Sequence, residues 1–335
     1  MKVLMVCNYR PGVGGISGQV ELLQRHLRDE GNQVDVFNTK ASLWKRLLMV
    51  SRLCRVAKTY DVIHVHCCSQ WGFFPAVVGI TAGRKLGKRL VLTYHGGGGE
   101  KFFDRHRKFV HYYLTRTDAN IVLSGFLAKV FEKYRLPYAI IPNIIEMDDK
   151  FYRERSELHP WFVCVRSHEE LYNIPCILKA FKQVQARCPN ARLTLVGDGT
   201  LHESLKQLAA QLKLENVTFT GRVPNSEIYH YLNNDDIMLS SPVVDNMPVS
   251  LLEAMNAGLL VISSRVGGVP YLVADHHDGL LFESDDETEL AEKMLWALDH
   301  QEASVELAKQ GHRSAAQYLW RNVRVKIYAT YGVHS

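Results

Sequence analysis

The first part of the chain alternates short apolar segments with segments of helical periodicity. Residues 2–7 form an apolar run that predicts a strand, and residues 18–30 place apolar side chains at helical spacing before Gly31 ends the pattern. Further strands are predicted at residues 34–37, 61–66, 89–95, 119–123 and 138–141. Strands that alternate with helices predict a parallel sheet covered by helices on both faces.

The same pattern begins again after a polar linker near residues 142–158. Strands are predicted at residues 161–165, 192–196, 217–220, 237–240 and 259–263. Helices are predicted at residues 175–186, 201–214 and 248–257, and from residue 287 to the end. We therefore expect an α/β protein of two Rossmann-like, doubly wound domains, residues 1–150 and 151–314, facing a central cleft. A last helix, residues 315–335, is expected to cross back onto the first domain.

Length and charge fit this division. A chain of 335 residues exceeds what one core usually supports. Residues 1–150 carry 23 Lys and Arg against 12 Asp and Glu, whereas residues 151–335 carry 17 against 23. A basic first half indicates an anionic partner, such as a membrane surface, a phosphorylated acceptor or nucleic acid. Unequally charged solvated surfaces explain the same asymmetry.

Residues 42–60 are predicted to form one amphipathic helix. Apolar side chains from Leu43 to Ala57 lie on one side, with Lys and Arg interleaved and Trp44 nearby. The helix either packs on its own sheet or contacts an anionic membrane peripherally, which would suit a lipid-linked acceptor.

Composition argues against several other classes. The seven cysteines include no C-x-x-C pair, which favours neither a disulfide framework nor a zinc site and fits a cytoplasmic location. The apolar run at residues 71–82 is too short to span a bilayer. We expect the rings of His64 and His66 to lie on opposite faces of their strand and residues 276–278 to form a surface turn, so no metal site is predicted.

The segment from Ser240 to Gly258 holds the most informative pattern. Asp245 and Glu253 flank a turn, and Pro248 suits the first position of the helix that follows. The free N–H groups of residues 249–251 would then form an anion site at the positive end of the helix dipole. We expect Glu253 to accept ribose hydroxyls, the helix end to bind a diphosphate, and Asp245 to face a sugar.

Here the chain resembles the retaining glycosyltransferases of family 4, which have the GT-B fold. Asp245 to Glu253 resembles the E-x7-E signature of that family, with Asp in place of the first acid. The other matching blocks are Gly12 to Gly15, Tyr94-His95-Gly96, Ile141-Pro142-Asn143 (where Ile144 replaces a Gly), Leu195 to Gly199, Phe219 to Val223 and Gly267 to Pro270.

The resemblance implies the roles of the site residues. His95 would contact the transferred sugar or the acceptor, and Arg166 would neutralise the diphosphate leaving group. The expected donor-binding residues are Gly14, Gly15, Arg166, Gly197, Val223, Asn246, Met247, Pro248, Val249, Ser250 and Glu253, and the expected catalytic residues are Asp245, Glu253, His95 and Arg166. The family usually adds a Lys, but this chain has Leu171-Tyr172-Asn173-Ile174 in its place.

The predicted activity is transfer of a sugar from a nucleotide-diphosphate sugar to a hydroxyl acceptor, namely a glycan, a glycolipid or a small molecule. The resemblance implies retention of configuration by front-face attack, without a cofactor or a metal, and UDP is favoured over GDP and ADP as the nucleotide. No nucleic-acid partner is expected. Two alternatives stay open, a noncatalytic nucleotide-sugar-binding subunit and a nucleotide-sugar epimerase. A dinucleotide dehydrogenase is disfavoured because residues 12–17 lack the third glycine of G-x-G-x-x-G.

Overall fold

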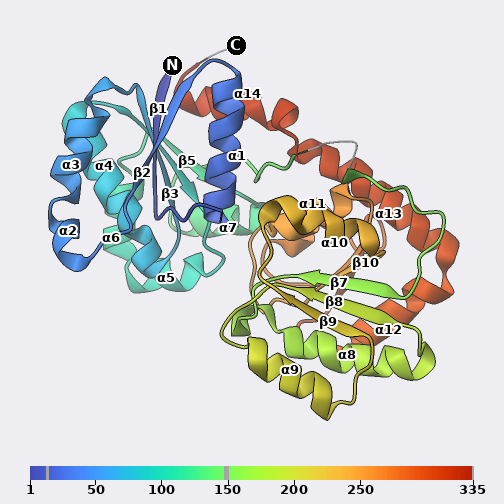
Figure 1. Cartoon of the computed structure of the whole chain (residues 1–335). Helices are drawn as coiled ribbons and strands as arrows, with labels where there is room; N and C mark the ends of the chain where they lie inside the picture. The colour runs from blue at the N-terminus through green and yellow to red at the C-terminus, as the bar shows by residue number, and fades with distance from the viewer. Residues whose placement is uncertain (13–14, 147–150, 334–335) are drawn as a thin grey trace. The chain divides into compact units, whose positions relative to one another are not determined.

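A computed structural model of the chain describes residues 1–12, 15–146 and 151–333. The chain divides into two compact units (Figure 1). The first unit comprises Met1–Ile144 with Trp320–Ser335, and the second comprises Ile145–Leu319. Each unit is described separately below.

The first unit is built on a parallel sheet of six strands in the order β2-β1-β3-β4-β5-β6. These strands are β1 (Lys2–Cys7), β2 (Gln33–Asn38), β3 (Val62–Cys67), β4 (Arg89–Tyr94), β5 (Ala119–Val122) and β6 (Ala139–Ile140). The central strands are almost wholly buried and mostly apolar, as expected for a parallel sheet covered on both faces. The predicted strands of this half are confirmed.

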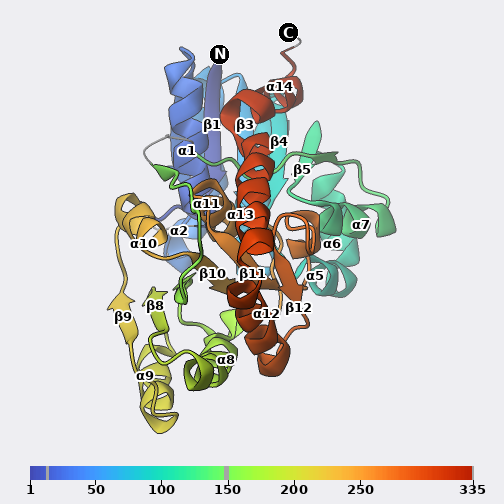
Figure 2. The same ribbon diagram turned by 90° about the vertical axis from the view of Figure 1, so that its right-hand side faces the viewer.

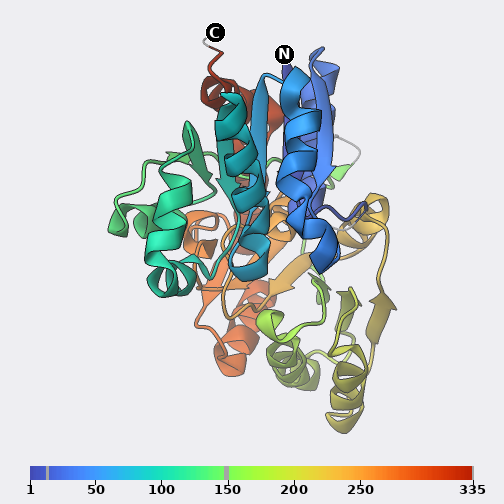
Figure 3. The same ribbon diagram turned by 90° about the vertical axis from the view of Figure 1, so that its left-hand side faces the viewer.

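Helices cover both faces of this sheet. One face carries α1 (Ile16–Asp29) and α14 (Trp320–Tyr331), whose Val323, Ile327 and Tyr331 join the core formed with β1 (Figure 2). The other face carries the remaining helices (Figure 3). These are α2 (Leu43–Leu47), α3 (Met49–Val56), α4 (Phe74–Leu86), α5 (Gly99–Arg105), α6 (Arg107–Leu114) and α7 (Gly125–Lys133), with the short 3-10 turns η1 (Ala57–Thr59) and η2 (Gln70–Phe73).

The second unit repeats this architecture with the strand order β12-β11-β10-β7-β8-β9, again all parallel. The strands are β7 (Trp161–Val165), β8 (Arg192–Val196), β9 (Val217–Gly221), β10 (Ile237–Ser240), β11 (Leu260–Ser264) and β12 (Leu280–Phe282). The helices are α8 (Ile174–Arg187), α9 (His202–Gln211), α10 (Ile228–Asn234), α11 (Val249–Asn256), α12 (Glu287–Asp299) and α13 (Gln301–Ala315). Figure 1 shows α8 and α9 on one side of the strands and α10 and α11 on the other. The expected pair of Rossmann-like units is confirmed.

Three predictions about helices were wrong or incomplete. Residues 42–60 do not form one helix, because α2 ends at Leu47 and the chain continues as α3 and η1. The segment after Glu287 is not continuous either, since α12, α13 and α14 are separate helices. The sequence pattern also missed α10 and β12, which are short elements whose apolar residues are buried by distant parts of the second unit.

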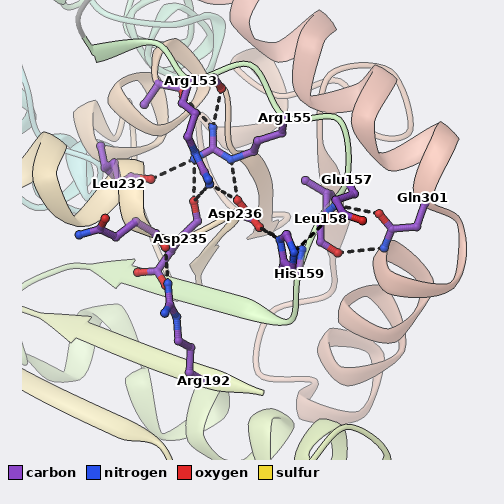
Figure 4. Close-up of polar contacts among 12 residues, drawn as sticks. Arg153, Arg155, Glu157, Leu158, His159, Arg192, Leu232, Asp235, Asp236 and Gln301 are labelled. Carbon is purple, nitrogen blue, oxygen red and sulfur yellow. Dashed lines mark hydrogen bonds and ion pairs between the residues drawn. The ribbon is translucent and has the colours of Figure 1, made fainter. Parts of the chain in front are cut away.

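A buried ion cluster fixes the start of β10 (Figure 4). The Asp236 carboxylate accepts hydrogen bonds from Arg155 Nε at 3.0 Å and from the backbone N–H of His159 at 2.9 Å. The side chains of Arg155 and Asp236 are only 2% and 1% exposed. Arg155 also donates to the carbonyl of Ala257 just after α11, at 2.8 Å. One arginine therefore ties the segment before β7 to the ends of β10 and α11.

Burial lowers the pKa of Arg155 to about 10, so its guanidinium stays charged at neutral pH and needs its partner. We predict that Asp236→Ala lowers the free energy of unfolding of the second unit by about 3–5 kcal/mol, because it leaves a buried cation unpaired. Urea-induced unfolding measures this loss.

Glu154→Ala is the matched control. Glu154 pairs with Lys309 at 3.1 Å in a largely exposed ion pair, so its loss is expected to cost less than about 1 kcal/mol. A loss in Asp236→Ala no larger than in this control would contradict the prediction.

Candidate functional site

The site of the second unit lies where the strand order reverses. β7 and β10 are neighbours, and the chain leaves them toward opposite edges of the sheet. Arg166 follows the last residue of β7, and Ser240 is the last residue of β10. Arg166 donates from Nε and Nη2 to Ser240 Oγ at 3.3 and 3.2 Å. Crevices at such switch points bind ligands in open α/β sheets.

Arg166 is a buried cation held between an acid and an aromatic ring. Its Nη2 lies 3.1 Å from Asp245 Oδ2, and the two side chains are 9% and 18% exposed. Its guanidinium carbon lies 5.0 Å from the centroid of the Tyr172 ring, within the range of a cation–π contact. Two of the residues predicted to be catalytic, Arg166 and Asp245, are thus in direct contact.

Two glycines let backbone approach this pair closely. Gly267 has φ of +52°, and a Cβ atom there would lie 1.9 Å from the carbonyl oxygen of Asp245. That carbonyl accepts a hydrogen bond from the N–H of Gly268 at 3.0 Å, which fixes the loop that carries Asp245. At Gly197, φ is +148° and a Cβ would lie 1.9 Å from the Arg166 carbonyl oxygen. Both positions require glycine.

Glu253 lies on α11, and its carboxyl interacts electrostatically with Arg166. Burial raises the pKa of its carboxyl to about 7, while Arg166 opposes that rise and Glu146 adds to it. Burial and the charge of Glu253 also raise the pKa of Tyr229. The charge of Arg166 therefore acts on both acids, directly on Asp245 and electrostatically on Glu253.

The start of α11 differs by one residue from the expected one. Pro248 is the N-cap residue, with φ −68° and ψ 111°, and Val249 is the first helical residue. The first N–H groups of a helix carry the positive end of its dipole. The expectation of a free N–H at Leu251 was wrong, because that group donates to the carbonyl of Pro248 at 3.2 Å. Within the part of the chain that the structure describes, the buried Ser250 Oγ in this first turn has no hydrogen-bond partner. Buried polar atoms of this kind indicate a place for a ligand.

The other predicted donor-binding residues lie nearby in the chain or at neighbouring strand ends. Asn246 and Met247 are buried in the loop before α11. The N–H of Asn246 donates a hydrogen bond to Oδ1 of the preceding residue, Asp245, at 2.8 Å. Val223 is partly exposed and follows β9. β9 borders β8, whose end Gly197 follows.

The segment that lacks the expected Lys forms a 3-10 turn, η4 (Glu170–Tyr172), followed by Asn173 with φ of +43°. Asn tolerates this left-handed conformation better than most residues. The sequence has no Lys or Arg between Arg166 and Lys179. The Tyr172 ring lies against Arg166 from this turn, where the family's Lys was expected.

In the first unit, the predicted Gly14 lies outside the described residues. Gly15 has φ of +69° and is the N-cap residue of α1. His95 follows β4, and its N–H donates to the carbonyl of Cys67 at 2.8 Å. His95 Nε2 lies 3.1 Å from His66 Nδ1, so one of these two nitrogens carries the shared proton.

The expectation that His64 and His66 lie on opposite faces of β3 was wrong. Residues two apart on a strand share a face, and the two ring centroids are 4.2 Å apart. His64 bonds to Tyr331 Oη of α14 and to Thr93 Oγ1, each at 2.8 Å. No group of three His, Cys, Asp or Glu side chains in the described ranges is arranged to hold a metal ion.

Burial keeps these imidazoles neutral. It lowers the pKa of His64 to about 3 and that of His95 to about 4, and it lowers the pKa of His66 well below its ordinary value. The three rings border a cavity of about 30 Å³, with Gln19 and Asn143 also in its lining. The buried His66 Nε2 has no hydrogen-bond partner among the described residues. The cavity therefore offers uncharged donors and acceptors to a group of hydroxyl size.

Two family models match this chain, and relatives and solved structures resemble it. The model of the family "Glycosyl transferases group 1" matches residues 148–314, and that of "Glycosyltransferase Family 4" matches residues 38–149. An uncharacterized glycosyltransferase of Methanocaldococcus jannaschii is 23% identical over 99% of this chain and 98% of its own length. Alpha-monoglucosyldiacylglycerol synthase of Streptococcus pneumoniae is 24% identical over 88% of this chain and 77% of its own.

Among solved structures, HepE of Anabaena in complex with UDP superposes with a TM-score of 0.80 at 18% identity, over 99% of this chain and 100% of the other. Sucrose-phosphate synthase of Thermosynechococcus elongatus reaches 0.81 at 18% identity, over 99% and 98%. These likenesses show that the fold is that of the GT-B glycosyltransferases.

Because the pKa of Glu253 is raised, we expect its ionisation to lower the free energy of unfolding in the absence of ligand. A carboxyl whose pKa is about 7 when folded and about 4.5 when unfolded binds its proton more tightly in the folded state. Stability is therefore lost as the pH rises through that window. We expect Glu253→Gln to raise the free energy of unfolding by about 1–3 kcal/mol at pH 8, and to change it little at pH 4.

Urea unfolding of both proteins across pH 4–8 checks this. Glu292→Gln, at an exposed carboxylate of α12, is the control and should shift stability equally little at both ends. A Glu253→Gln variant less stable than the wild type at pH 8 would contradict the prediction.

Proposed function

Because the chain belongs to the family 4, group 1 glycosyltransferases, we propose that it moves a sugar from a nucleotide-diphosphate sugar to a hydroxyl acceptor. The observation that carries the proposal is the buried Arg166 at the strand-order reversal of the second unit. It is ion-paired with Asp245, and its charge acts on the Glu253 carboxyl of α11.

Each part of the donor has a matching group in this unit. The ionised Glu253 carboxylate accepts two hydroxyls of a ribose, and the N–H groups of Val249 and Ser250 with Arg166 bind the diphosphate. Asp245, held by Arg166, accepts hydroxyls of the transferred sugar. His95 of the first unit is neutral and suits an uncharged sugar or acceptor hydroxyl.

The proposed chemistry retains the anomeric configuration and uses no metal ion. The acceptor oxygen attacks the anomeric carbon on the face from which the diphosphate leaves, and a phosphate oxygen takes the acceptor's proton. The Asp245 carboxylate is engaged by Arg166 and the N–H of Asn246, which suits it to orienting hydroxyls. The leaving diphosphate gains negative charge that Arg166 and the α11 dipole stabilise, and one such donor can lower a barrier by about 2.7–4 kcal/mol.

UDP is the proposed nucleotide because HepE, whose fold this chain shares, has been crystallised with UDP. Two other functions predict different behaviour. A noncatalytic nucleotide-sugar-binding subunit, which the missing Lys favours, would bind the donor and transfer nothing. A nucleotide-sugar epimerase would convert donor without an acceptor.

The first test is a thermal-shift panel of UDP, GDP and ADP. At a hundredfold excess over its Kd, the bound nucleotide stabilises the protein by about 2.7 kcal/mol, or roughly 5–10 °C in Tm. We expect UDP to give this shift and Glu253→Ala to lose most of it. A shift with NAD alone, or an equal UDP shift in Glu253→Ala, would refute the assignment.

The second test restores the missing cation. Tyr172→Lys places an ammonium group beside Arg166, so we expect UDP to bind about five- to tenfold more tightly by isothermal titration calorimetry. Leu171→Lys, at the neighbouring exposed position, is the control and should leave the Kd unchanged. Unchanged or weaker binding by Tyr172→Lys would show that the diphosphate does not lie at this turn.

A further inference from the structure

The first unit carries a group of large apolar side chains that face solvent. Their exposed fractions run from 45% for Phe109 to 82% for Trp44. The members of this group, termed the Trp44 face, are Trp44, Leu47, Leu48, Trp71, Phe109 and Tyr112. Isolated exposed apolar residues are normal, but a group of this size marks an interaction surface.

The three elements that carry the Trp44 face are neighbours. Trp44, Leu47 and Leu48 are spaced three and four residues apart at α2 and its end, so they share one side of that turn. The Arg46 guanidinium lies 5.6 Å from the Trp71 ring of η2, which connects α2 to η2. Phe73 of η2 packs against Phe109 of α6 at 5.7 Å between ring centroids, which connects η2 to α6.

The surroundings of the Trp44 face are strongly basic. Between Lys40 and Lys88 the sequence has nine Lys and Arg, counting both ends, and one acid, Asp61. The exposed basic residues on and beside α3, α5 and α6 are Arg52, Arg55, Lys58, Lys101, Arg105, Arg107 and Lys108. α5 and α6 add only the acids Glu100 and Asp104, and both pair with Lys133.

We propose that the Trp44 face docks on an anionic lipid bilayer, and that the sugar acceptor is presented there as a lipid-linked hydroxyl. The lipid-linked acceptor rests on the proposed function, whereas docking on the bilayer does not depend on it. Tryptophan and leucine side chains insert at the boundary between headgroups and acyl chains, and the surrounding Lys and Arg contact anionic headgroups. Within the described residues, none of the helices has the length and apolar character of a membrane span.

Charge and chemistry favour a bilayer over other occupants. A second copy of this chain would bring one basic surface against another in a two-fold symmetric contact, and such like charges repel. Nucleic acid would match the basic residues but gives Leu47 and Leu48 nothing to bury against. An anionic bilayer complements both the charge and the apolar side chains.

Co-sedimentation of the full chain with vesicles tests the proposal. We expect binding to phosphatidylcholine vesicles that contain phosphatidylglycerol, weak binding to pure phosphatidylcholine, and release at high NaCl. The double variant Trp44→Ser with Leu47→Ser should lower the partition coefficient at least about tenfold, because each side chain loses its apolar insertion. Val325→Ser, which truncates an exposed apolar residue of α14, is the control and should bind like the wild type.

A charge variant separates the electrostatic contribution. Arg52→Gln with Arg55→Gln should weaken binding about tenfold or more and reduce its salt dependence, since each basic residue near the surface contributes about 1 kcal/mol. Lys206→Gln with Lys213→Gln, exposed lysines of the second unit, is the matched control and should change neither.

Several outcomes would overturn the proposal. These are no sedimentation at low salt, equal binding to neutral vesicles, or double variants that bind like the wild type. A dimer in sedimentation velocity that Trp44→Ser with Leu47→Ser dissociates, without vesicle binding, would assign the face to a second copy. Tighter binding to a random oligonucleotide than to vesicles would assign it to nucleic acid.

The UDP thermal shift, measured on the same proteins, keeps the two proposals apart. Vesicle binding without a UDP shift contradicts the proposed function and supports the docking surface. A UDP shift without vesicle binding supports the proposed function and contradicts the docking surface.

Discussion

The site of the second unit depends on one buried cation. Arg166 extends from the end of β7 across the reversal of strand order, and its position is set by Ser240 at the end of β10 and by Asp245 in the next loop. Glycine at positions 197 and 267 allows the backbone to close around this pair, where any side chain would collide with a carbonyl oxygen. A cation held this firmly loses little entropy on binding an anion, which is the advantage of preorganisation.

That placement relies on a second ionic contact deeper in the unit. Arg155 bonds both Asp236, which precedes β10, and the carbonyl of Ala257, which follows α11. β10 carries Ser240, which bonds Arg166, and α11 carries Glu253, so the buried cluster links the two elements that present these residues. The two arginines differ in environment, because the Arg155 side chain is enclosed by carbonyls and a carboxylate, whereas Arg166 contacts a hydroxyl, a carboxylate and an aromatic ring.

The sequence was sufficient for what depends on local patterns and insufficient for what depends on contacts across the fold. Apolar runs predicted most strands, whereas the shared site of Asp245 and Glu253 stays a prediction. The Arg166–Ser240 contact was missed, because Ser240 lies 74 residues away and shows no pattern of its own. The pairing of His66 with His95 was missed for a simpler reason, namely that the face of β3 was assigned wrongly. The break between α2 and α3 was also missed, since a continuous apolar periodicity does not reveal where a surface helix ends.

Burial has different electrostatic consequences in the two units. In the first, burial keeps His64, His66 and His95 neutral, so that their cavity offers hydrogen bonds without charge. In the second, burial disfavours the charged form of an acid, because Glu253 is desolvated near Glu146. The charge of Arg166 offsets only part of this strain. A ligand that donates hydroxyl hydrogens to Glu253 relieves that strain, whereas an anion near Arg166 removes part of its compensation. A ligand that carries hydroxyls beside its anionic group offsets the second effect with the first, which a free phosphate cannot do.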